Sequence, residues 1–211
     1  MTDFRVDPGR MALVNIDMQN CFVENSPLAA PDGPATLERI NHLLSACRKA
    51  GVMVIHTAHV LRPDGSNMGV MGELIEPVRD GYINKDRSTS NLHPRLDVQP
   101  DDIILDKPRY GSFHGTDLEL VLRNRQIDTL IISGICTNIC CETTAREANM
   151  RDFRVFFLSD GTATFPTMGV SAAEIQRVSL ATLATAFAQV LSVNEMVEKL
   201  ESASMQPATA A

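Results

Sequence analysis

Short apolar runs alternate along the chain with segments in which apolar residues recur at helical spacing. The apolar runs predict buried strands at 11–16, 52–57, 103–105, 129–133, 154–158 and 190–193. The helical spacing predicts helices over 37–50, 116–125, 138–150, 171–187 and from the last strand to residue 200. The pattern therefore alternates strand and helix from about residue 11 onwards.

Several local signals fix the ends of these helices. Gly51 stands where a C-cap glycine is expected, and capping boxes are predicted at Thr116 with Glu119 and at Ser171 with Glu174. The segment 58–101 is rich in turn residues and predicts one short helix at most, around 72–78.

Strand and helix alternation with nearly continuous apolar strands favours an α/β fold, with a parallel sheet covered by helices on both faces. A length of 211 residues suits one such domain, which we assign to residues 1–200. The segment 201–211 is small and polar, and we expect a disordered tail.

The composition limits the kinds of binding partner and the cellular compartment that we expect. A formal net charge of −7 weighs against nucleic acid and against an anionic membrane as a partner. No apolar run approaches the roughly 20 residues of a membrane span, and the N-terminus lacks the pattern of a signal peptide. We therefore expect a cytoplasmic protein.

The five cysteines fit neither a disulfide framework nor a zinc site. Their number is odd, their spacing is irregular, and the cluster formed by Cys136, Cys140 and Cys141 contains no C-x-x-C pair. At least one of these thiols therefore requires another explanation.

Three polar residues follow three different predicted strands. Asp17, Lys107 and Cys140 come after the strands at 11–16, 103–105 and 129–133. In a parallel sheet all three emerge at the same edge, where ligands bind. Alone, each is more often structural, but a carboxylate, an ammonium and a thiol together form a set suited to covalent catalysis. A position in the first turn of a helix and a neighbouring lysine predict a lowered pKa for the Cys140 thiol.

Three segments resemble the motifs of isochorismatase-like hydrolases. They are Asp17 to Phe22 (DMQNCF), Lys107 to Thr116 (KPRYGSFHGT) and Gly134 to Ala148 (GICTNICCETTAREA), which occur in the family's order. The similarity extends from about residue 11 to residue 197. The resemblance implies a three-layer α/β/α fold, with a doubly wound parallel sheet of about six strands.

The same resemblance implies a mechanism. Cys140 falls on the family's nucleophile, with Asp17 as the general base and Lys107 as the cationic partner. The peptide bond between Ile135 and Cys136 falls where the family commonly has a cis bond, and the backbone N–H groups of Cys136 and Cys140 would then form an oxyanion hole. The implied reaction is hydrolysis of a C–N bond in a small amide or ureido compound, through a thioester, with release of ammonia or an amine.

This sequence departs from the motifs of two branches of the family, and these differences narrow the reaction that we expect. Isochorismatases usually lack the cysteine, so Cys140 weighs against that activity. Nicotinamidases carry a D-x-H metal motif, and here His59 and Leu61 take its two ligand positions. We therefore expect no metal and no cofactor, although any residual metal affinity of His56 and His59 stays open. The motifs look closest to those of ureidoacrylate, biuret and N-carbamoylsarcosine amidohydrolases.

The remaining expectations concern the pocket and the assembly. Phe22, Arg62, Tyr110 and Phe113 are the candidate pocket residues, and Arg62 suits a substrate carboxylate. The family usually forms homo-oligomers, so a dimer or tetramer is expected. The alternatives are a metal-poor nicotinamidase-like or isochorismatase-type hydrolase and a flavodoxin-like thiol redox or binding protein, in which Cys136 or Cys141 would be the resolving thiol.

Overall fold

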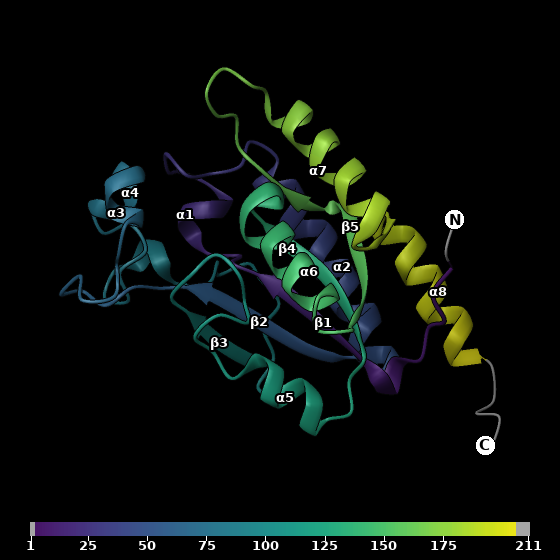
Figure 1. Cartoon of the computed structure of the whole chain (residues 1–211). Helices are drawn as coiled ribbons and strands as arrows, with labels where there is room; N and C mark the ends of the chain where they lie inside the picture. Colours follow the sequence, from purple (N-terminus) through teal and green to yellow (C-terminus); the bar gives the residue numbers. More distant parts are fainter. Residues whose placement is uncertain (1–2, 206–211) are drawn as a thin grey trace.

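The computed structural model describes residues 3–205 and contains one sheet of six parallel strands in the order β3-β2-β1-β4-β5-β6 (Figure 1). The order reverses between β1 and β4, as in a doubly wound sheet, and the predicted fold is confirmed. The strands are β1 (Met11–Ile16), β2 (Met53–His59), β3 (Ile103–Lys107), β4 (Thr129–Ile135), β5 (Arg154–Ala163) and β6 (Gln189–Leu191).

Helices cover both faces of this sheet (Figure 1). The α-helices are α1 (Asn20–Val23), α2 (Gly33–Ala50), α3 (Met71–Leu74), α4 (Glu76–Arg79), α5 (Leu118–Asn124), α6 (Glu142–Asn149), α7 (Ala172–Ala186) and α8 (Val193–Met205). Short 3₁₀ turns span Pro8–Arg10 and Ser88–Ser90, and a single π-helical turn, Thr137–Cys141, precedes α6. Within residues 3–205, no helix is both long and apolar enough to cross a membrane.

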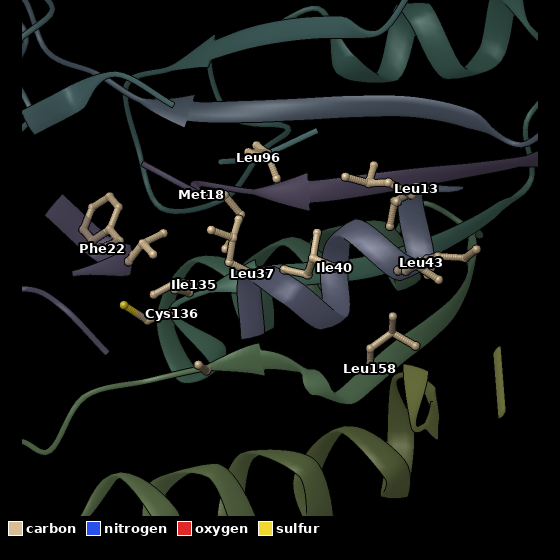
Figure 2. Packing of buried hydrophobic residues seen from close by; sticks show 14 of the residues in the cluster. Leu13, Met18, Phe22, Leu37, Ile40, Leu43, Leu96, Ile135, Cys136 and Leu158 are labelled. Atoms are coloured by element: carbon tan, nitrogen blue, oxygen red, sulfur yellow. The ribbon is translucent and has the colours of Figure 1, made fainter. Parts of the chain in front are cut away.

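The sheet separates two apolar clusters. Helices α2 and α8 pack on one face, and α5, α6 and α7 contribute to the cluster on the other. In Figure 2, Leu37, Ile40 and Leu43 of α2 lie along β1, the strand that carries Leu13, in the first cluster. Because strands buried on both faces need apolar residues at every position, the near-continuous apolar runs predicted the strands well.

The helix ends confirm some of the predicted signals. Helix α2 ends at Gly51 in the left-handed region, with φ of 84°, and the Ser171–Glu174 capping box is present at α7. The predicted capping box at Thr116 is wrong. The Thr116 hydroxyl instead donates to the carbonyl of Ser112 at 2.6 Å and accepts from the N–H of Leu118, so it closes a loop that precedes α5.

The boundaries of several other elements also differ from the prediction, and those of the strands depend on contacts between strands. Strands β2 and β3 run further than predicted, to His59 and Lys107, where these two residues are paired in register. The short helix predicted around 72–78 is two helices, α3 and α4, separated by an extended Ile75. Helix α8 continues to Met205, so residues 201–205 are helical rather than disordered, and residues 206–211 lie outside the described part of the chain.

Candidate active site

Asp17 follows β1 directly, at the carboxyl edge of the sheet. Its backbone takes a left-handed conformation with φ of 52°, and its N–H donates to the carbonyl of Thr57 at 3.1 Å. The Thr57 hydroxyl donates to Oδ1 of Asp17 at 2.6 Å, and Nζ of Lys107 lies 2.8 Å from Oδ2. Apart from that ion pair, Oδ2 accepts no hydrogen bond from the described residues, and the carboxylate is fully buried.

Lys107 is the last residue of β3 and is also fully buried. Its ammonium donates to the backbone carbonyls of Arg109 and Tyr110, both at 2.9 Å. Burial by itself lowers the pKa of this lysine, but the charge of Asp17 opposes that effect, and the net shift is upward. Lys107 is therefore an ammonium at neutral pH.

Cys140 lies in the π-helical turn between β4 and α6. The peptide bond before the turn, between Ile135 and Cys136, is cis. The N–H of Cys141 closes the turn by donating to the carbonyl of Cys136 at 3.0 Å, and the Cys140 carbonyl accepts from the Thr144 hydroxyl at 2.8 Å. The turn places the thiol in a buried position beside Asp17 and Lys107.

The Cys140 thiol is protonated in the resting protein. Burial is the largest cause that raises its pKa, and Asp17 acts in the same direction; although Lys107 and the backbone N–H of Cys136 lower it in part, the net pKa is about 12. The prediction of a lowered pKa is therefore wrong, because loss of solvent outweighs the nearby positive charge. A thiol in this environment reacts only where a base can take its proton, and the Asp17 carboxylate lies within reach.

Two hydroxyl groups connect the loop after β3 to the turn that carries the cysteine. The N–H of Ser112 donates to Oγ1 of Thr144 at 3.1 Å, and the two side-chain hydroxyls lie 3.0 Å apart. Since Thr144 also binds the Cys140 carbonyl, this contact fixes the Lys107 loop relative to the thiol. Both residues lie in the motif segments that the sequence analysis quoted, but their pairing was not predicted.

His59 belongs to the same cluster, although its sequence context suggested only the position of a metal ligand. One ring nitrogen of His59, one carboxylate oxygen of Asp17 and Sγ of Cys140 lie within 4.8 Å of one another. Gln19 fixes the backbone of His59 by accepting from its N–H at 2.8 Å and donating to its carbonyl at 3.1 Å. The presence of Gln19 in the segment DMQNCF was the available signal for this contact.

Comparison with known proteins identifies this cluster with a family. The family model for the isochorismatase domain matches residues 11–195. The chain belongs to the isochorismatase family. It is 34% identical to nicotinamidase 3 of Arabidopsis thaliana over 193 residues, which cover 90% of this chain and 88% of that protein. It is 32% identical to the ureidoacrylate amidohydrolase RutB of Methylorubrum extorquens over 175 residues, which cover 74% and 71% respectively.

A solved structure agrees with this assignment. The cysteine hydrolase from Pseudomonas syringae pv. phaseolicola 1448A superposes with a TM-score of 0.90 at 39% identity, covering 95% of this chain and 97% of that one. The protein is thus a hydrolase of the isochorismatase family, and the cysteine-hydrolase assignment is supported. These relatives do not share one substrate, so the substrate has to be argued from the site itself.

The predicted pocket residues fall in different places. Phe22 is buried in α1, in the same apolar cluster as Cys136 (Figure 2), and Tyr110 is half-buried with its ring 5.8 Å from that of His59. Arg62 is exposed and lines a cavity of about 280 Å³ that Lys107 also lines. Phe113 packs against Phe153 and beneath the guanidinium of Arg151, in the apolar cluster that also contains Cys140.

The metal motif of nicotinamidases does not fit these residues. Leu61, at the second ligand position, is a buried apolar side chain, and both ring nitrogens of His56 are bonded, to Asn15 and Asp102. Across residues 3–205, the groups able to gather around one ion are those of Asp17, His59 and Cys140, and the Lys107 ammonium lies against them. That positive charge opposes a bound cation, so we assign no catalytic step to a metal.

The redox alternative also fits poorly. An oxidant-sensing pair needs an exposed thiol with a low pKa. Cys136, Cys140 and Cys141 are all buried, and burial raises the pKa of each. The cluster therefore favours a thiol that is activated by a base during a reaction.

Proposed function

We propose that this protein is a cysteine-dependent hydrolase that cleaves a C–N bond in a small amide or ureido compound and releases ammonia or an amine. The observation that carries the proposal is the buried contact between a thiol, a carboxylate and an ammonium, contributed by Cys140, Asp17 and Lys107. The similarity to a nicotinamidase and to a ureidoacrylate amidohydrolase supports the C–N class.

In this mechanism Asp17 is the general base. Oδ1 is engaged by Thr57, so Oδ2 is the oxygen that takes the proton from Sγ of Cys140. Because the pKa of Cys140 is raised to about 12, the proton moves as the sulfur attacks the carbonyl carbon, and no resting thiolate is needed. Lys107 stabilises the negative charge, whether it is on the carboxylate or on the sulfur.

The attack forms a tetrahedral intermediate with a negative oxygen. The backbone N–H of Cys136 lowers the pKa of the Cys140 thiol, which supports a position of this N–H near the reacting atom. We assign this N–H and that of Cys140 to the oxyanion hole. Asp17 then returns its proton to the leaving nitrogen, the C–N bond breaks, and ammonia or an amine departs from a thioester on Cys140.

Water completes the cycle. Asp17, again ionised, takes a proton from a water molecule, whose oxygen attacks the thioester carbonyl. The C–S bond breaks and the proton returns to sulfur, which leaves an acid, or a carbamic acid when the substrate is a ureido compound. Phe22, Tyr110, Phe113 and Arg62 remain the proposed substrate-binding residues, with Arg62 for a substrate carboxylate at the rim. A small-molecule substrate, a homo-oligomer and a cytoplasmic location likewise stay predictions.

The test is ammonia release from a panel of small amides and ureido compounds by the wild type and by Cys140→Ala. The panel contains nicotinamide, N-carbamoylsarcosine, ureidoacrylate, biuret and maleamate, each assayed with and without a chelator. We expect turnover of at least one compound, insensitivity to the chelator, and no turnover by the variant. Activity that survives in Cys140→Ala would place the nucleophile elsewhere, and silence of the wild type across the panel would contradict the proposed reaction.

A further inference from the structure

His59 presents a buried acceptor that the proposed catalytic steps do not use. The side chain is 3% exposed, and its Nε2 has no hydrogen-bond partner among the described residues. Such an atom is rare in a folded protein, because an unpaired buried polar group destabilises the native state. Nε2 therefore calls for a ligand that the free protein does not contain.

The fold holds the His59 ring at the reacting atoms. His59 ends β2, between Lys107 at the end of β3 and Asp17 after β1. Gln19 fixes its backbone, and the ring packs edge-on against Tyr110. Since a His59 ring nitrogen, an Asp17 oxygen and the Cys140 sulfur are mutually within 4.8 Å, one small group can contact all three.

The protonation of the ring decides what it can bind. Burial lowers the pKa of His59 well below its ordinary value, and the charge of Lys107 adds to this effect, so the imidazole is neutral at pH 7. The carbonyl of Pro108 acts in the opposite direction and raises this pKa in part, so it lies near the ring. Because Nε2 has no partner among the described residues, we assign the ring proton to Nδ1, from where it can be donated to this carbonyl. Nε2 therefore carries a lone pair and can only accept a hydrogen bond.

We propose that Nε2 of His59 accepts a hydrogen bond from the second nitrogen of a ureido substrate, an inference that rests on the proposed function. A carbonyl carbon bonded to Sγ of Cys140 has three other substituents. The oxygen points to the N–H of Cys136, and the leaving nitrogen contacts Asp17, which protonates it. The remaining substituent faces His59. In a ureido compound whose second nitrogen carries a hydrogen, such as biuret or ureidoacrylate, it is an N–H group, which satisfies Nε2.

A carboxamide has a carbon atom at that position. It leaves Nε2 buried without a partner in the complex, as in the free protein, and the substrate gains no contact there. Sites that hydrogen-bond a substrate N–H group discriminate strongly against analogues that lack it. We therefore expect kcat/KM to favour a ureido compound by about 10- to 100-fold over the carboxamide in which CH₂ replaces NH.

Three matched pairs make this comparison: biuret with malonamide, N-carbamoylglycine with succinamate, and ureidoacrylate with glutaconamate. Within each pair the molecules differ only by NH against CH₂, so size and charge are constant. The measurement is ammonia release by the wild type at several substrate concentrations. Equal or better turnover of the carboxamide in the pairs that react would overturn the role of His59 and leave the proposed function standing. No ammonia from these pairs, together with turnover of another amide of the panel, would also overturn that role, whereas silence across every compound would contradict the proposed function.

Variants of His59 distinguish a role in substrate recognition from a purely structural role of this residue. His59→Leu removes the acceptor, and we expect the ureido-to-carboxamide ratio of kcat/KM to fall to near one. His59→Gln keeps an acceptor oxygen and is expected to retain part of the preference. His93→Leu, which removes another buried histidine, is the control and should keep the wild-type ratio. If His59→Leu folds and keeps the wild-type ratio of ureido to carboxamide kcat/KM, the proposal is overturned. If this variant does not fold, the substrate pairs with the wild type and with His59→Gln test the proposal.

Discussion

At the scale of single residues, the site keeps one charge pair ionised and one thiol neutral. Asp17 holds a left-handed backbone, which aspartate tolerates better than bulkier or branched residues do. Its carboxylate is bonded to Thr57 and paired with Lys107, whereas Cys140 is held as a thiol by burial. The base is therefore formed before substrate arrives, and the nucleophile is formed only during the attack.

Lys107→Met tests the buried ion pair. The substitution leaves Asp17 as a buried carboxylate with no counter-charge, and breaking such a pair destabilises a protein by about 3–5 kcal/mol. We expect the free energy of unfolding, measured in urea, to fall by that amount. We also expect ammonia release to fall by at least about 100-fold, which is the lower range for loss of a general base. Turnover equal to the wild type would contradict the role assigned to Lys107.

Thr57→Val tests the hydrogen bond to Oδ1 of Asp17. The change keeps the shape of the side chain but removes a buried donor at 2.6 Å, so we expect about 1–3 kcal/mol of lost stability and about 10-fold lower kcat. Thr129→Val is the matched control, since the Thr129 hydroxyl also donates to an aspartate from a buried strand position. It should lower stability without lowering kcat, and an equal loss of kcat in both variants would remove Thr57 from the site.

At the scale of elements, the end of β4 determines where the nucleophile lies. Gly134 has φ of 121°, and a Cβ atom at this position would lie 2.0 Å from the backbone oxygen of Ile16. Any side chain here would push β4 away from β1 three residues before the turn that contains Cys140. The glycine therefore allows the cysteine and Asp17 to approach each other.

Gly134→Ala should accordingly separate the two strands. We expect the free energy of unfolding to fall by at least about 1–3 kcal/mol from backbone conformation alone, and further because of the steric overlap. Activity should also fall strongly. Urea unfolding and ammonia release measure the two effects. Gly9→Ala is the control, because its Cβ would meet only an atom of Asp7 at 3.8 Å. A wild-type unfolding midpoint in Gly134→Ala would show that the close approach is not required.

The elements also show what the sequence can and cannot predict. The strands and the shared edge of Asp17, Lys107 and Cys140 were predictable, because apolar runs and the rule for parallel sheets are local or topological. The neutral state of Cys140 and the place of His59 were not. Both depend on burial by chain segments that are distant in sequence, and a sequence motif does not show how far its residues are shielded from solvent.

At the scale of the whole molecule, a buried polar network crosses the centre of the sheet from β4 to β2. The Ser133 hydroxyl donates to Asn15 at 2.9 Å, and the Asn15 amide lies 3.0 Å from Nδ1 of His56. Nε2 of His56 lies 3.1 Å from Asp102, which Arg48 binds in turn. A neutral His56 with its proton on Nε2 satisfies every contact, since Nδ1 then accepts from Asn15 and Nε2 donates to Asp102.

This network makes the folded protein sensitive to mild acid. Burial lowers the pKa of His56 and of His59, so below the unfolded pKa of about 6.5 the unfolded chain binds protons that the folded chain does not. Stability should therefore rise with pH between about 5 and 7, with a slope of up to about 1.4 kcal/mol per pH unit for each histidine. Carboxylates with lowered pKa, such as Asp102, produce losses only below about pH 4.

Urea unfolding at pH 5.5, 6.5 and 7.5 measures this slope. In His56→Gln the overall stability should fall, because the network is broken, but the dependence on pH should become shallower. His42→Gln changes an exposed histidine and should leave the slope as it is in the wild type. A flat profile for the wild type, or one in which stability increases toward acid, would mean that His56 and His59 accept protons in the folded state as readily as in the unfolded chain.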